Sequence, residues 1–318
     1  MNSITNSLRL LALIIISCHY ITHSLTITQA DIDSGLIIDQ PGTWELIENL
    51  TFTTPYAIII TSTGVSLNLN NYSIRGDNLG QVAIQISNSD CHILNGTIEN
   101  STSTAIEISQ SSGVSIENIT YQNCSASISV LDSEYTNIAS CTVIHSENTA
   151  ISVNNSPYTT LKNITITECL SDCVVITGTS NSSFLNQIQV SHSTGTNGIK
   201  ISSDMITLKG IVAFSLAGNA LAIEGNNVEM CFASIGLNNG HGCIISGSET
   251  HLQQCSFSKN NGDGILLQAT STNTSIINSL SSGNSHIGIN NLGANSNQLN
   301  STLCCNNGVR DLWRIINN

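Results

Sequence analysis

Charged side chains are scarce in this sequence: only 9% of the 318 residues are Asp, Glu, Lys or Arg, and Lys and Arg together number eight. A protein that binds nucleic acid needs a basic face to displace counterions, and eight basic residues cannot readily form one. We therefore exclude nucleic acid as a partner. Aromatic residues (4%) and proline (three) are also rare. Solubility must come from the hydroxyl and amide groups of the abundant Ser, Thr and Asn.

Long hydrophobic runs are absent as well. The longest, "LLALIII" at residues 10–16, is far shorter than the roughly 20 residues that a membrane-spanning helix needs. It follows Arg9 and precedes small residues, a pattern typical of a secretory signal peptide over residues 1–24. The alternative is "IISC", which resembles a lipobox and makes Cys18 the lipid-bearing N-terminus of a lipoprotein. The sequence thus predicts a secreted, extracellular or cell-surface protein with no transmembrane segment.

Cysteine, by contrast, is present eleven times, but its spacing fits neither zinc ligands nor a clear disulfide framework. Small apolar core filler is the expected role of most of these residues. Removing residues 1–24 leaves ten cysteines, an even number that permits some bridges.

What the sequence does contain is an internal repeat. A small residue, an aliphatic anchor, a variable residue and a second aliphatic residue recur eleven times, with anchors 22 to 26 residues apart. The second aliphatic position is Ile, Val or Leu in every repeat except the last, where it is Asn291. The anchors are Ile58, Ile84, Ile106, Ile128, Ile151, Val174, Ile199, Leu221, Cys243, Ile265 and Ile289. Such periods are the signature of a repeat architecture in which each lap buries its inner face by stacking on its neighbours.

Within a lap, apolar residues alternate in two or three short runs, which indicates strands with one face inward. Laps of this length predict an all-β, right-handed parallel β-helix, a solenoid of about eleven laps over residues 55–308. Its core is one elongated hydrophobic column, and the rod is on the order of 50 Å long. Residues 25–54 are expected to form an N-terminal cap. Residues 309–318, "VRDLWRIINN", are expected to form a C-terminal cap, built as a short amphipathic helix.

A polar residue also recurs after the second strand of the first five laps. Stacked amides there predict a structural ladder with hydrogen bonds between laps. Three of these positions match the N-glycosylation sequon, but ladder side chains pointing inward are not accessible to glycosylation. The predicted ladder consists of Asn70, Asn95, Asn118, Ser140 and Asn163.

The stretch "PGTWELIENLTF" with "IIITSTGVSLNLNNYSIRG" resembles the opening of right-handed β-helix repeat proteins of the pectin-lyase-like superfamily. Those proteins show a Gly-x-aromatic-x-Leu opening and then a Val-x-Leu-Asp-Leu-Asn-Gly lap. This chain departs from the pattern at Asn68 and Asn71, where Asp and Gly are usual. The resemblance covers roughly residues 36–308. It implies the fold more than an activity, because the fold hosts lyases, hydrolases, epimerases, adhesins and inert scaffolds.

The segment "GHG" at residues 240–242 is similar to the active-site histidine motif of polygalacturonases. The order of motifs differs, however, because Asp172 lies three laps before His241, about 14 Å along the rod, while hydrolysis needs two carboxyls within roughly 5–9.5 Å. Asp172, Asn197, Asn219, His241 and Asp263 each stand two residues before an anchor. His241 is therefore assigned to a polar turn column of the repeat.

A different column offers catalytic candidates. His145, Glu168 and His192 end the third strands of consecutive laps, and Asp172 follows Glu168 by four residues. Two imidazoles beside a carboxylate can act as an acid–base pair or hold a divalent metal. The alternative is a solvated turn that carries titratable residues by chance. No other cofactor is indicated.

Two functions from different classes follow. The first is a surface or secreted β-helix, expected to be a monomer, that binds polysaccharide or cell-surface glycan, or forms an adhesive scaffold, without turnover. The second is a carbohydrate-active enzyme, namely a polysaccharide lyase, glycoside hydrolase or epimerase, as the resemblance implies. The small number of charged residues and the lack of a complete set of catalytic residues favour binding without turnover.

Overall fold

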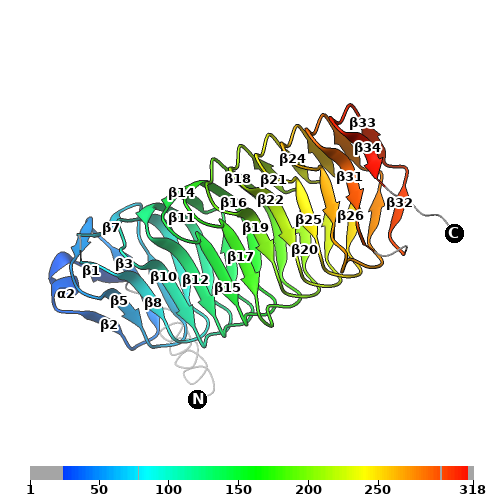
Figure 1. The fold of residues 1–318 in the computed structure, drawn as a ribbon. Helices are drawn as coiled ribbons and strands as arrows, with labels where there is room; N and C mark the ends of the chain where they lie inside the picture. The colour runs from blue at the N-terminus through cyan, green and yellow to red at the C-terminus, as the bar shows by residue number, and fades with distance from the viewer. Residues whose placement is uncertain (1–23, 78, 294–295, 314–318) are drawn as a thin grey trace, which may run out of the picture.

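In the computed structural model, which describes residues 24–77, 79–293 and 296–313, the chain coils into a parallel β-solenoid of three strand faces (Figure 1). All strand pairs between laps are parallel, and successive laps stack along one axis from β1 to β34 (Figure 1). The all-β parallel helix predicted from the repeat is confirmed. The predicted signal segment and Cys18 lie outside the described residues, apart from Ser24. No helix within the described part of the chain is long and apolar enough to span a membrane.

The first face, sheet 1, contains one strand from every lap and carries the anchors of the repeat. All eleven anchors are completely buried, and each pairs with the anchor of the next lap, from Ile58 with Ile84 to Ile265 with Ile289. Its strands are β2 (Leu36–Ile38), β5 (Tyr56–Ile60), β8 (Val82–Ile86), β10 (Thr104–Ser109), β12 (Ala126–Leu131), β15 (Ile151–Asn154), β17 (Val174–Thr177), β19 (Asn197–Ile201), β22 (Asn219–Ile223), β25 (Cys243–Ile245), β28 (Ile265–Leu267), β31 (Ile287–Asn291) and β34 (Arg310–Trp313).

The second face, sheet 2, follows sheet 1 in each lap. Its shorter strands are β1 (Leu25–Ile27), β3 (Gly42–Leu46), β6 (Val65–Asn68), β13 (Asn137–Ala139), β20 (Thr207–Lys209), β23 (Glu229–Cys231), β26 (His251–Gln253), β29 (Ser275–Ile277) and β32 (Gln298–Asn300).

The third face, sheet 3, closes the lap. Its shorter strands are β4 (Leu50–Phe52), β7 (Ser73–Gly76), β14 (Thr142–Ser146), β21 (Val212–Phe214), β24 (Ser234–Gly236), β27 (Ser256–Ser258), β30 (Leu280–Ser282) and β33 (Leu303–Cys305). Four long strands bend at the corner and belong to both sheets 2 and 3: β9 (His92–Glu99), β11 (Ser115–Cys124), β16 (Thr160–Cys169) and β18 (Phe184–Ser191).

The sheets meet at three corners, which we number in chain order: corner 1 after sheet 1, corner 2 between sheets 2 and 3, and corner 3 before the next lap. Each corner repeatedly uses a residue with positive φ, such as Asn118 (56°) at corner 2 and Asn123 (50°) at corner 3. Asn tolerates this left-handed conformation better than most residues, because its short polar side chain bonds locally. The chain's richness in Asn is therefore partly a requirement of its corners.

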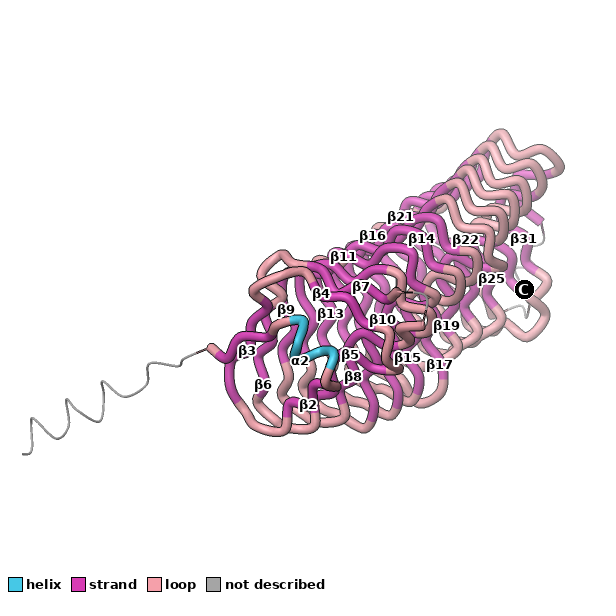
Figure 2. The backbone as a smooth tube through the Cα atoms, turned by 90° about the vertical axis from the view of Figure 1, so that its left-hand side faces the viewer, coloured by secondary structure: helices cyan, strands magenta, loops and turns pink. Residues whose placement is uncertain are grey.

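The two caps differ from the sequence-based prediction. Residues 36–52 are not a separate cap, since β2, β3 and β4 form a full lap in register with the next one. Among the described residues, β1 and the short helix α2 (Gln29–Asp33) lie at this end, where Figure 2 shows α2 across the opening of the coil. Ile32 of α2 is buried. At the other end, residues 310–313 form strand β34 and not an amphipathic helix. The coil thus extends by one full lap before the predicted array and by one strand, β34, after it.

The cysteines confirm their predicted role as core filler. Seven of the ten described cysteines are buried and all ten are free thiols. Burial raises the pKa of Cys124 to about 11 and of Cys141 to about 12. A buried thiol with a raised pKa is a poor nucleophile, so these two side chains are packing groups.

Candidate functional site

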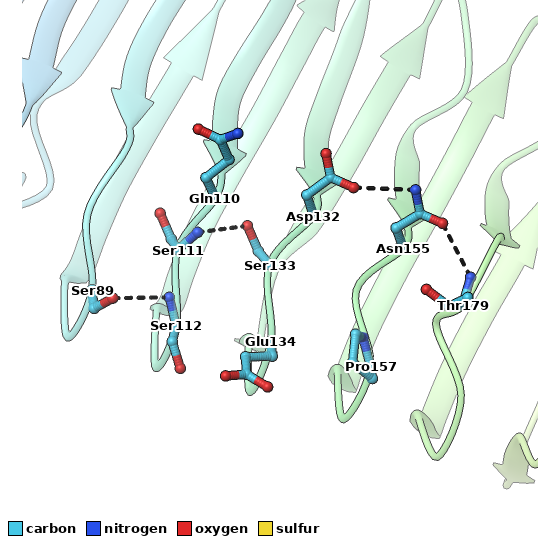
Figure 3. Close-up of a pocket in the computed structure, with 10 residues that line it drawn as sticks. All are labelled: Ser89, Gln110, Ser111, Ser112, Asp132, Ser133, Glu134, Asn155, Pro157 and Thr179. Carbon is cyan, nitrogen blue, oxygen red and sulfur yellow. Dashed lines mark hydrogen bonds between the residues drawn. The ribbon is translucent and has the colours of Figure 1, made fainter.

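A groove with a volume of about 880 Å³ crosses five laps at corner 1 (Figure 3). Strands β10, β12, β15 and β17 of sheet 1 end here, and their following turns supply most of the lining. Adjacent laps repeat at ~4.8 Å, so the groove extends about 19 Å along the rod. The lining residues are Ser89, Gln110, Ser111, Ser112, Asp132, Ser133, Glu134, Asn155, Pro157 and Thr179.

Hydrogen bonds between laps brace the floor of this groove. The backbone N–H of Ser111 donates to Oγ of Ser133 at 3.1 Å, and the N–H of Ser133 donates to Oγ of Ser156 at 3.0 Å. Nearer the surface, Nδ2 of Asn155 donates to Oδ1 of Asp132 at 3.1 Å, and Oδ1 of Asn155 accepts from the N–H of Thr179 at 3.2 Å (Figure 3). These bonds hold hydroxyl and carboxylate oxygens in place before any ligand arrives, which lowers the entropy cost of binding.

Charge in the groove is of one sign. Asp132 and Glu134 lie in one turn and both are exposed, while no Lys or Arg is among the lining residues. The side chain of Glu134 makes no hydrogen bond or ion pair to any other described residue. The groove therefore offers many hydrogen-bond acceptors and a negative potential.

Two tyrosines directly follow groove-lining residues. Tyr135 follows Glu134, and Tyr158 follows Pro157 in the next lap. Their rings stack with centroids 4.8 Å apart and planes only 6° apart, and they are 55% and 48% exposed. Such exposure is unusual in a chain with 4% aromatics, and it presents a flat apolar surface beside a polar groove.

The predicted catalytic column exists as a register. Ser146 pairs with Cys169 and Thr167 pairs with Ser191, so His145, Glu168 and His192 occupy equivalent positions of consecutive laps. All three have positive φ, 55° to 60°. The corner 3 residues of other laps also have positive φ, so this backbone conformation is a feature of the corner and does not mark a catalytic site.

The same three side chains make no ion pair or hydrogen bond with one another that would define a catalytic pair. Glu168 and His192 are exposed and His145 is half-buried. The ring of His192 meets that of Phe214 edge-on, 5.8 Å between centroids. In the described part of the chain, no group of three or more His, Cys, Asp or Glu side chains could hold a metal ion.

Asp172 does not join this column. Its Oδ1 accepts the backbone N–H of Asn197 in the next lap at 2.7 Å, so the carboxylate caps a turn. The column that contains Asp172 also contains His241, as the repeat predicts. Nδ1 of His241 accepts the backbone N–H of Asp263 at 2.9 Å, and Oδ1 of Asp263 accepts that of Ile287 at 2.9 Å.

In these contacts the side chain of His241 caps the turn of the next lap. Nδ1 can accept a hydrogen bond only while it is unprotonated. Burial lowers the pKa of His241, against the opposing influence of the Asp263 carboxylate 3.6 Å away, and so favours the neutral ring.

The polar residues predicted as a ladder lie at corner 2, with side chains outside the core. Nδ2 of Asn118 donates to Oδ1 of Asn95 at 3.2 Å, which is the expected kind of contact between laps. The prediction that these side chains point inward is wrong, because Asn118, Ser140 and Asn163 are exposed and Asn70 and Asn95 are half-buried. The positive φ of the corner turns each side chain away from the interior.

A buried asparagine ladder does exist elsewhere, and the sequence analysis missed it. It follows corner 3 in the later laps, where Oδ1 of Asn260, Asn284 and Asn307 each accepts both the N–H and the Nδ2 of the asparagine in the preceding lap. The bonds from Nδ2 are 2.9, 2.9 and 3.0 Å long. The ladder residues are Asn238, Asn260, Asn284 and Asn307. Their spacing of about one lap was the available signal, as was the 23-residue separation of Tyr135 and Tyr158.

Comparison with known proteins agrees with this geometry. A family model described as "Right handed beta helix region" matches residues 56–208. The A-module of the mannuronan C-5 epimerase AlgE6 from Azotobacter vinelandii is similar in structure, with a TM-score of 0.72, 14% identity, and 90% of this chain and 91% of that chain covered. The comparison with curated proteins gives no match to this sequence.

Two further solved structures were determined with saccharides. The tailspike protein of E. coli bacteriophage HK620, in complex with a hexasaccharide, has a TM-score of 0.64 at 13% identity, covering 86% of this chain and 60% of that chain. The catalytic domain of an α-1,3-glucanase, in complex with tetrasaccharides, has a TM-score of 0.54 at 12% identity, covering 86% and 58%. The class of fold is thus defined: this chain is a right-handed parallel β-helix.

Proposed function

We propose that this protein is a secreted or cell-surface β-helix that binds a glycan, without turnover, in the groove at corner 1. The observation that carries the proposal is the pairing of a braced polar groove with the exposed, stacked rings of Tyr135 and Tyr158.

The two surfaces match the two kinds of surface on a sugar. Hydroxyl groups of a glycan find acceptors and donors in the Ser, Asn, Asp and Glu side chains of the groove. The C–H faces of a pyranose ring are apolar and suit the flat face of a tyrosine, whose rigid ring costs little entropy to hold. A length of about 19 Å accommodates a linear oligosaccharide lying along the rod.

The tyrosine pair also leaves space for such stacking. Gly113 stands one lap before Tyr135 in the positive-φ positions of corner 1, and Ser182 stands one lap after Tyr158. Both neighbours are small, so neither carries a side chain large enough to cover a tyrosine ring. The tailspike and glucanase complexes with oligosaccharides support a glycan ligand on this fold.

Binding is tested on the purified protein with a glycan array followed by calorimetry on the best ligand. The double variant Tyr135→Ala/Tyr158→Ala is expected to bind at least about tenfold more weakly, about 1.4 kcal/mol. Phe232→Ala, which removes an equally exposed ring at corner 2 of a distant lap, is the matched control and should leave affinity unchanged. Unaltered affinity in the tyrosine variant contradicts the proposed site.

The second candidate is a carbohydrate-active enzyme that uses His145, Glu168 and His192. The register that aligns these three side chains favours it, as does the likeness to an epimerase module. Incubation with pectin, alginate, galactan and glycosaminoglycans, with and without calcium or zinc, tests it by unsaturated-uronide absorbance and new reducing ends. An epimerase changes neither readout, so the NMR spectrum of recovered alginate completes the screen. Product that is lost in Glu168→Gln would replace the binding proposal with this one.

A further inference from the structure

We infer that the corner 1 groove selects neutral glycans and discriminates against polyuronates. The inference rests on the glycan binding proposed above and names the class of ligand. The observation behind it is the pair of carboxylates, Asp132 and Glu134, in a groove whose lining contains no basic side chain.

Both carboxylates line the groove in which the ligand is proposed to bind. Asp132 lies in the central lap of the five and keeps one oxygen free, because only its Oδ1 accepts from Asn155 (Figure 3). Glu134 belongs to the same turn, adjacent to Tyr135. A sugar hydroxyl can donate to these oxygens, and hydrogen bonds to charged acceptors are the stronger kind. A sugar carboxylate has no proton to donate and brings a second negative charge.

No basic residue of the described chain lines the groove. Nζ of Lys200 pairs with Oε1 of Glu224 at 3.0 Å, and Nζ of Lys209 lies 6.0 Å from the ring centroid of Phe232. Arg75 lines a separate hollow of about 310 Å³ together with Asn100 and Asn123 of corner 3. A protein that binds polyuronate needs basic side chains along the bound polymer. The corner 1 groove has the carboxylates of Asp132 and Glu134 instead.

The overall charge of −13 reinforces the local effect only weakly. At 0.1 M salt, exposed charges more than about 10 Å apart are largely screened. The carboxylates inside the groove are within that distance of any bound sugar, whereas most other acids are not. Removal of two charges in the groove should therefore matter more than removal of two charges elsewhere.

The experiment compares matched pairs of polymers that differ in the oxidation state of the sugar's C6: β-1,4-mannan with polymannuronate, α-1,4-galactan with polygalacturonate, and β-1,4-glucan with polyglucuronate. Binding of oligomers of equal length is measured at 0.1 M NaCl with EDTA. For any backbone that binds, the neutral member is expected to bind at least about tenfold more tightly. In 1 M NaCl, where screening shortens to about 3 Å, the ratio should fall.

Variants localise the effect. Asp132→Asn/Glu134→Gln should lower the preference for the neutral member to about twofold or less. The control Glu229→Gln/Glu249→Gln removes the same charge from exposed positions in laps outside the groove and should leave the preference intact. Equal loss in both variants would assign the preference to overall charge and overturn the inference.

The outcomes separate this inference from the proposed function. If a uronate polymer binds as tightly as its neutral partner in EDTA, or binds tightly only once calcium is added, the groove accepts acidic glycans and the inference is wrong while glycan binding stands. If neither member of any pair binds, and the wider glycan array is also blank, the proposed function fails and the inference fails with it.

Discussion

The early and late laps build the same coil from different interactions. In residues 56–208, the strands β9, β11, β16 and β18 are eight to ten residues long and continue through corner 2. In residues 209–305, every strand of sheets 2 and 3 has only three residues, such as β26 and β27. Figure 1 shows both parts on one axis, the first in blue to green and the second in yellow-green to red.

The difference is sharpest in the column that follows corner 3. The early laps place Cys124, Ser146, Cys169 and Ser193 there, whereas the late laps place Asn238, Asn260, Asn284 and Asn307. Asn238, Asn260 and Asn284 are buried. The late side chains bond to one another from lap to lap. The early hydroxyls bond instead to backbone carbonyls, as Oγ of Ser146 does to that of Ser125 in the preceding lap at 3.1 Å. A ladder of amides supplies bonds between laps where the strands are short.

The comparison also shows which laps carry exposed groups that are not needed for stacking. The groove and the two tyrosines lie in the early laps, where continuous strands stabilise the stack and leave corner 1 available for exposed groups. The late laps use their polar residues for stacking. Three tests address this division, from the largest expected effect to the smallest.

Asn260→Leu should cause the largest loss of stability. It removes the acceptor of the Asn238 N–H at 3.4 Å and of its Nδ2 at 2.9 Å, and so leaves buried donors unpaired. We expect about 3 kcal/mol of destabilisation. Ser146→Ala, at the same column in an early lap, should cost about 1 kcal/mol. Chemical denaturation followed by circular dichroism measures both, and equal losses would erase the distinction between the two regions.

Acid should weaken the late laps through His241. Burial lowers its pKa below the usual 6.5, so the folded protein binds this proton less readily than the unfolded chain. The contribution of His241 is therefore complete above about pH 6.5 and is lost as the pH falls through the folded pKa. Because protonated Nδ1 cannot accept the Asp263 N–H, about 1 kcal/mol is at stake.

The check is His241→Asn, which resembles Asn219, the residue that caps the preceding lap. Unfolding midpoints of both proteins are compared between pH 7.5 and 5. The wild type should lose stability relative to the variant as the pH falls. Parallel curves would show that the imidazole does not titrate in this way.

The hydrogen bond between exposed corner 2 side chains should matter least. Asn118→Gly retains access to a φ of 56° and loses one exposed hydrogen bond, so we expect a cost of about 0.5 kcal/mol. Asn118→Val places a β-branched residue in the left-handed region and should cost about 1–2 kcal/mol. Thermal unfolding distinguishes these values. A loss in Asn118→Gly as large as that in Asn260→Leu would mean that the exposed ladder is as important as the buried one.

Much of the fold could be predicted from the repeat, because stacking forces each lap to present an aliphatic residue to the same core column. Ile106 and Ile128 illustrate this: their 22-residue separation is one lap, and they pair in sheet 1. The ends were predicted less well. Gly35, Leu36 and Ile38 carry the small–aliphatic pattern, and Leu36 pairs with the anchor Ile58, so this lap was visible in the sequence but was assigned to a cap.

The candidate site was less predictable. The lap spacing of Tyr135 and Tyr158 is visible in the sequence, but whether two residues in register stack outside or pack inside depends on the corner between them and the core. The same limit explains the ladders: Asn118 and Asn260 have the same side chain, yet only the second is buried. One residue's shift at a positive-φ corner reverses the direction in which a side chain points.

The repeat in the sequence was enough to determine the period, the identity of the buried anchors and the turn-column position of His241. All of these properties recur in every lap, so they are visible in the linear sequence. Only the tertiary structure decided which polar columns face the core and that side chains from five laps meet at corner 1. Those outcomes depend on the summed turn of three corners per lap, which no local stretch of residues specifies alone.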